Sequence, residues 1–150
     1  MAFRSKRFNT DKFVDGTWVN ISIYDPETGE YDDGDFKIAR AGNPVYEKAL
    51  ESSGYRKMED SEDKQRALYR AIAIGVLKDW KGVTAEDEKG NKFELPYSVD
   101  NATETLIANP DLVGRVLSEA NDLANYRRED VAAQKKKRAT SKGGSTATSE

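Results

Sequence analysis

The sequence predicts a single α+β domain in which an N-terminal β-hairpin packs on three to four α-helices. Three observations predict it: strict alternation of apolar and polar residues over 17–24, two Asn-Pro pairs that precede helical patterns, and a closing segment with nothing to bury. We place a loose arm at residues 1–12, the domain at residues 13–130, and a basic, Ser/Thr/Gly-rich disordered tail at residues 131–150.

The predicted hairpin begins with a strand over residues 17–24. The apolar residues of one face are Val19, Ile21 and Ile23. Turn chemistry follows in Asp-Pro-Glu-Thr-Gly, with Pro26 and Gly29, and a second strand then returns through Phe36 and Ile38. Because a two-stranded hairpin is marginal alone, its apolar face should pack on the helices.

Capping residues predict where the first two helices begin. Asn43 followed by Pro44 indicates an N-cap and a first helical residue, opening a short helix that closes near Gly54. Asp60 or Ser61 then caps a long helix of about 20 residues, for which Gly82 is the expected C-terminal glycine.

The second half repeats this pattern. A small turn or hairpin is expected over residues 86–95, and Pro96-Tyr97-Ser98 leads into a short helix over residues 99–108. Asn109-Pro110 opens the last helix, whose apolar residues recur at three and four positions. The stripe consists of Leu112, Val113, Val116, Leu117, Ala120, Leu123 and Ala124.

Residues 71–77 are seven uncharged residues that span almost two helical turns. Such a segment must be buried around most of its circumference, which a small domain achieves only with difficulty. It is either a central helix wrapped by the hairpin and the last helix, or a helix with one face left for self-association. Gly75 costs about 1 kcal/mol relative to Ala inside a helix, so it should permit close packing with a neighbour.

The composition lowers the expectation of an enzyme. The chain contains neither Cys nor His, which excludes thiolate catalysis, Cys-ligated zinc and Ser-His-Asp arrangements. The acidic residues between Asp25 and Asp35 do not match a calcium loop, since Gly29 stands where the third ligand belongs. Glu86, Asp87, Glu88 and Glu94 are interpreted as turn residues rather than paired catalytic carboxylates. We therefore expect no catalytic residue, no cofactor and no metal.

Charge and hydropathy bear on location and partners. No apolar segment follows the basic N-terminus as in a signal peptide, and the most apolar run, residues 67–80, is shorter than the roughly 20 residues of a membrane span. Residues 131–150 carry five basic residues and one acid, whereas residues 1–130 carry 19 basic and 26 acidic residues. An acidic body with a basic tail is a poor nucleic-acid binder outside that tail. We expect an intracellular protein without a membrane partner.

Several segments in succession resemble the tail assembly chaperones of long-tailed, siphovirus-type bacteriophages. They are "FKIARAGNPVYEKALE", a predicted helix ending in "LKDWKGV", an acidic turn, "PYS", "NATETLIANPDL" and "EANDLANY". The likeness covers roughly residues 35–127. The predicted strand at residues 17–24 departs from a mostly helical family, so this part is either an addition or a sign of a mixed fold.

The resemblance implies a non-enzymatic assembly factor in the host cytoplasm, absent from the mature virion. Such proteins bind the tape-measure protein, keep it soluble, help the tail-tube protein to polymerise around it, and self-associate. Many are made in two lengths by a ribosomal frameshift, and consecutive Lys codons at residues 135–137 form a candidate slippery run.

The apolar helix faces are the predicted partner and self-association interface. Its candidate residues are Ile72, Ile74, Val76, Trp80, Val113, Val116 and Leu117. The rival from another class is a small nucleic-acid-associated factor that uses the basic termini, "RSKR" at residues 4–7 and "KKKR" at residues 135–138. A carboxylate enzyme acting on a bound metal ranks third.

Overall fold

The structure, a computed structural model, describes residues 2–128 and has the predicted α+β fold. The tail predicted at residues 131–150, with the candidate frameshift run, lies outside the described residues. The chain divides into a compact unit, Thr10–Tyr126, and a smaller unit that contains residues 2–9 with Arg127 and Arg128. Each unit is described by itself.

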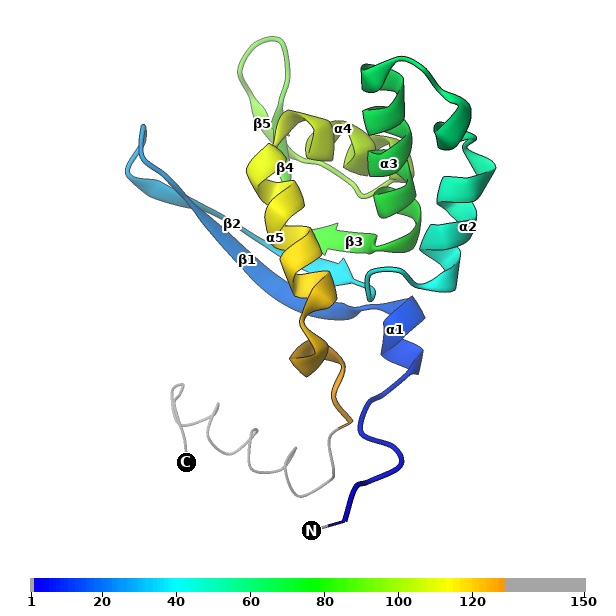
Figure 1. Ribbon diagram of the computed structural model, residues 1–150. Helices are drawn as coiled ribbons and strands as arrows, with labels where there is room; N and C mark the ends of the chain where they lie inside the picture. The colour runs from blue at the N-terminus through cyan, green and yellow to red at the C-terminus, as the bar shows by residue number, and fades with distance from the viewer. Residues whose placement is uncertain (1, 129–150) are drawn as a thin grey trace, which may run out of the picture. The chain divides into compact units, whose positions relative to one another are not determined.

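A three-stranded antiparallel sheet, in the order β1-β2-β3, forms one layer of the larger unit (Figure 1). β1 (Thr17–Asp25) and β2 (Glu30–Ile38) make the predicted hairpin, which pairs in register from Thr17↔Ile38 to Asp25↔Glu30. The inner face of β1 carries Val19, Ile21 and Ile23, as the alternation predicted, and Ile21 is completely covered.

The third strand corrects the sequence prediction. The long helix was expected to continue to Gly82, but α3 (Ser61–Gly75) ends seven residues earlier and the chain becomes β3 (Leu77–Lys81). Tertiary contacts override the local pattern here. The Asn43 amide donates to the Gly75 carbonyl at 2.8 Å, and Trp80 pairs opposite Phe36 on β2. The apolar residues of β3 are therefore buried by the sheet.

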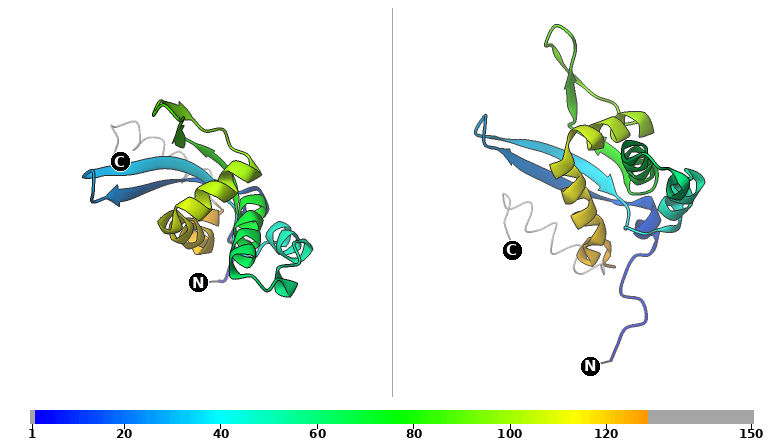
Figure 2. Two further views of the ribbon diagram at one scale, coloured as in Figure 1. Left: turned by 90° about the horizontal axis from the view of Figure 1, so that it is seen from above. Right: turned by 45° about the horizontal axis from the view of Figure 1, so that its top comes forward.

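Four helices cover the sheet and one another: α2 (Pro44–Ser52), α3, α4 (Val99–Ala108) and α5 (Pro110–Asn121). The predicted caps Asn43 and Asp60 are hydrogen-bonded, since their side chains accept backbone N–H groups in the first turns of α2 and α3. Ser98 caps α4 in the same way. Asn109 precedes Pro110 as predicted but makes no side-chain cap. Figure 2 shows α3 between α2 and α4, both of which pack against it.

The uncharged run at residues 71–77 belongs to a central helix and the strand after it. Ile72, Val76 and Leu77 are buried in the main core with Ile38 and Val116. Gly75 permits the expected close approach, because a β-carbon there would lie 2.4 Å from the Cα of Tyr46 on α2. The fold therefore has the central helix that was one of the two interpretations of this run.

Short elements complete the two units. α1 (Asp11–Asp15) begins inside the arm predicted at residues 1–12, and its Phe13 contacts the buried ring of Tyr126 in η2 (Leu123–Tyr126). A further turn, η1 (Tyr55–Lys57), joins α2 to α3. In the smaller unit, Phe8 forms a β-bridge with Arg127.

Candidate binding cleft

A cleft opens where the chain leaves the three-stranded sheet. β3 pairs with β2 only at Asp35–Ile38, and at Gly82, with φ +81°, the chain turns into a second small sheet. That sheet consists of β4 (Thr84–Glu86) and β5 (Lys92–Glu94), the hairpin expected over residues 86–95. Figures 1 and 2 show the two hairpins diverging. A cavity of about 480 Å³ lies in this region, lined by β2, β4 and the α4–α5 junction.

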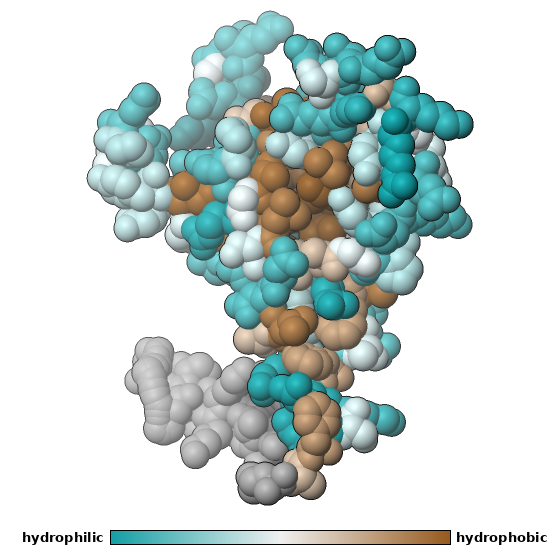
Figure 3. Space-filling model, in the orientation of Figure 1, coloured by the Kyte–Doolittle hydropathy of each residue, from teal (hydrophilic) through white to brown (hydrophobic). Residues whose placement is uncertain are grey.

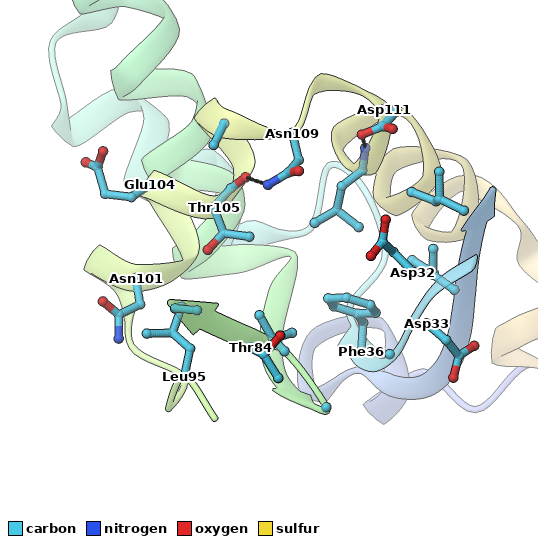
Figure 4. A pocket seen from close by; sticks show the side chains of 18 of the residues that line it. Asp32, Asp33, Phe36, Thr84, Leu95, Asn101, Glu104, Thr105, Asn109 and Asp111 are labelled. Carbon is cyan, nitrogen blue, oxygen red and sulfur yellow. Dashed lines mark hydrogen bonds between the residues drawn. The ribbon is translucent and has the colours of Figure 1, made fainter. Parts of the chain in front are cut away.

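Part of the cleft lining is apolar. Its apolar lining side chains are Ile21, Ile23, Phe36, Val83, Ala85, Leu95, Ala108 and Leu112. They come from both hairpins and both C-terminal helices, and Figure 4 shows Phe36 and Leu95 among the side chains around the cavity.

 The Trp80 indole N–H donates to the Leu95 carbonyl at 2.8 Å and so fixes the position of Leu95. The floor is thus a continuation of the main core that reaches the surface.

Acidic residues line the same cleft. They are Asp32, Asp33, Glu104 and Asp111, and the lining within residues 2–128 includes no Lys or Arg. Glu104 is paired with Arg66, Asp33 accepts from the Ser22 hydroxyl, and Asp111 accepts the Leu112 N–H at 2.8 Å. In Figure 4 Asp32 points toward the cavity and Asp33 away from it, as successive residues of a strand must. The cleft combines an apolar floor with a negative wall.

Partly buried hydrogen bonds fix the segment that connects β5 to α4. The Tyr97 hydroxyl lies 2.5 Å from the Ala73 carbonyl and 2.6 Å from the Leu77 carbonyl, and its ring meets Trp80 edge-on at 5.4 Å. Burial, with a smaller contribution from the charge of Asp79, raises the pKa of Tyr97 to about 12. This phenol anchors one side of the cleft to the end of α3.

The seven interface residues predicted from the sequence lie elsewhere. Five of them are buried in the core: Ile72, Val76, Trp80, Val113 and Val116. Ile74 and Leu117 are half-buried. None of the seven lines the cleft, so the apolar stripes they belong to serve mainly to hold the domain together.

Apolar residues also reach the surface outside the cleft. Figure 3 shows hydrophobic residues gathered at the centre of one face, surrounded by hydrophilic ones. On the outer face of the β1–β2 hairpin, Trp18, Tyr24 and Tyr31 are exposed, the two tyrosines in edge-on contact at 5.3 Å. Lys81 lies over the Trp18 ring at 4.4 Å.

The acidic residues outside the cleft that the structure describes form no metal site, and Asp87 stabilises its own turn. Among the described residues, no group of three or more carboxylates is placed to hold a metal ion. Asp87 accepts the N–H groups of Lys89 and Asn91, both at 2.9 Å, and these bonds, that from Asn91 first, lower its pKa. No helix within residues 2–128 has the length and apolar character needed to cross a bilayer.

Comparison with known proteins gives a family. Residues 37–137, about two thirds of the chain, match the model of the family described as YdaY prophage protein. The match begins near the end of β2 and covers β3, the β4–β5 hairpin and α2 to α5. No curated protein and no solved structure matched. The chain therefore belongs to the YdaY prophage protein family.

Proposed function

We infer that this phage protein is a non-enzymatic tail assembly chaperone that binds the tape-measure protein in the host cytoplasm. It keeps that protein soluble, assists polymerisation of the tail-tube protein around it, and is absent from the mature virion. Self-association through exposed apolar residues accompanies this activity. Membership of a prophage family and the resemblance to tail assembly chaperones support the proposal.

The observation that carries the proposal is the cleft. An apolar floor that opens to the surface between two hairpins offers a place for an apolar segment of another protein. Its acidic wall gives that segment a preferred charge. The acidic balance of residues 1–130, with 26 acidic and 19 basic residues, favours the solubility of the chaperone itself.

Co-expression with the tape-measure protein of the same phage tests this function. We expect the tape-measure protein to be soluble only when this chain is present, and the two to elute together. A tape-measure protein that stays insoluble, with this chain eluting alone, would contradict the proposal.

One observation favours a second candidate, a nucleic-acid-associated factor. In the smaller unit the Arg128 N–H donates to the Arg7 carbonyl at 3.1 Å, and the Arg7 guanidinium lies 5.3 Å from the rings of Phe3 and Phe8. Basic and aromatic side chains together are typical of single-strand binding. Binding to an oligonucleotide that weakens steeply between two salt concentrations would support this alternative.

A further inference from the structure

We propose that the cleft takes an extended segment of a partner protein, with alternating basic and apolar residues, as an added strand on β2. The inference rests on the proposed function for the identity of the partner, and it adds the binding mode and the chemistry of the bound segment.

The first step concerns the open edge of β2. β1 pairs with β2 over all of Glu30–Ile38, but on the other side β3 pairs only with Asp35–Ile38. Of the five residues from Glu30 to Gly34, which β3 leaves unpaired, Tyr31 to Gly34 line the cleft. A β-carbon on Gly82 would lie only 3.8 Å from the Cα of Gly34, so the gap begins where β3 ends.

The second step concerns the direction of the backbone groups. Arg115 donates to the Ser22 carbonyl at 2.9 Å from α5, so this carbonyl faces the free side of β1 rather than β2. Ser22 is paired with Asp33, and Tyr24 with Tyr31. Because backbone groups alternate in an antiparallel ladder, those of Asp33 and Tyr31 point away from β1 and into the open side. Such an edge is a template for strand addition.

The third step concerns the side chains of the added strand. Residues on its inner side would lie beside Asp32 and Gly34 and face the apolar floor, where the Phe36 ring packs next to Gly34. This floor calls for apolar side chains. Residues on its outer side would lie beside Tyr31 and Asp33, both exposed. Residues 17–38 carry six acidic residues and one lysine, so lysine or arginine is favoured there. Charge complementarity thus selects the alternating basic and apolar segment over an acidic one.

A peptide-binding experiment with the full chain tests the assignment. The probe is an eight-residue peptide that alternates lysine and valine, and its matched control alternates glutamate and valine. We expect the lysine peptide to bind at least tenfold more tightly. In an added strand, the N–H groups of one residue type face β2 and those of the other type face away from it. We therefore compare a peptide methylated at every valine nitrogen with one methylated at every lysine nitrogen, and expect only one of the two to bind at least tenfold more weakly.

Two variants at one position separate the backbone donor from the side chain. Tyr31→Pro removes the outward N–H of β2, whereas Tyr31→Ala removes only the ring. We expect the proline variant to bind the peptide at least tenfold more weakly than the alanine variant. Equal affinities, no binding of the lysine peptide, or tighter binding of a helical peptide of the same composition would overturn strand addition. If the chain dimerises and Tyr31→Pro abolishes the dimer, the occupant of the cleft is a second copy of this chain. That result would overturn the partner assignment.

The two proposals fail separately. If the tape-measure protein is solubilised equally by the Tyr31→Pro and Tyr31→Ala variants, the binding mode is wrong and the chaperone function stands. If the lysine peptide binds as expected but the tape-measure protein stays insoluble, the strand-addition site stands and the chaperone function is wrong.

Discussion

Gly75 of α3 lies so close to Tyr46 of α2 that a β-carbon at Gly75 would be 2.4 Å from the Tyr46 Cα and 2.5 Å from its backbone nitrogen. Both obstacles are backbone atoms, so no rotamer change relieves the contact. The two helices can keep this spacing only while residue 75 is glycine.

Gly75→Ala is therefore expected to destabilise the fold by about 1–3 kcal/mol, because α2 must move away from α3. Gly114→Ala in α5 is the matched control, since nothing lies within 4 Å of a β-carbon there. The control should stabilise the chain by about 0.5–1 kcal/mol through helix propensity. Chemical denaturation of the three proteins measures both effects, and a stabilised Gly75→Ala variant would contradict the close contact.

Asn43 joins three parts of the fold and should be similarly intolerant. Its carbonyl oxygen caps α2, while its amide donates to Arg40 O at 2.7 Å and Gly75 O at 2.8 Å. Asn43→Ala should cost about 2–4 kcal/mol, because a cap is lost and buried carbonyls lose their donor.

Ser98→Ala is the comparison for that change, since Ser98 is an exposed cap with one acceptor bond to Asn101 N. It should cost about 1 kcal/mol. Equal losses of unfolding free energy in the two variants would show that the amide bonds of Asn43 contribute nothing.

Tyr97 and Tyr126 make the stability depend on alkaline pH. Burial is the main cause that raises the pKa of each to about 12, from an ordinary value of 10.0. Because the folded pKa exceeds the unfolded one, the protonated phenols stabilise the fold fully below pH 10, and this contribution is lost as pH rises through 12. Urea denaturation between pH 8 and 12 should show a steeper loss in wild type than in Tyr97→Phe. The same pH dependence in both proteins would contradict the role of Tyr97.

Arg115 protects the free edge of β1 through its bond to the Ser22 carbonyl. Arg115→Ala should increase concentration-dependent association, measured by light scattering, because an uncovered edge strand pairs with other chains. Arg70→Ala removes an exposed ion pair with Asp100 and serves as the control. It should change neither association nor, beyond about 1 kcal/mol, stability. Identical scattering from both variants would argue against edge protection.

The elements that local chemistry decides were predictable from the sequence. Asn43, Asp60 and Ser98 begin helices because their side chains accept nearby N–H groups, and alternation marked β1. β3 was not predictable, because its residues continue an apolar helical run. Only the pairing of Trp80 with Phe36 makes a strand of it.

The cleft could not be predicted for a related reason. Ile23, Val83, Leu95 and Leu112 lie in four separate segments, and no spacing links them. The interface predicted at Val113 and its neighbours followed the strongest apolar stripe, which the domain uses for its own core. A signal for the cleft existed only in Gly82, whose position after β3 lets the chain leave the sheet.

The most direct test of the central claim is co-expression of the tape-measure protein with a chain altered in the cleft. The variant carries Asp32→Lys and Asp33→Lys, and the control carries Glu51→Lys and Glu59→Lys, an equal charge change at exposed residues outside the cleft. We predict that wild type and control keep the tape-measure protein soluble and co-purify with it, while the cleft variant loses most of both. Equal solubilisation by the cleft variant and the control would contradict the account.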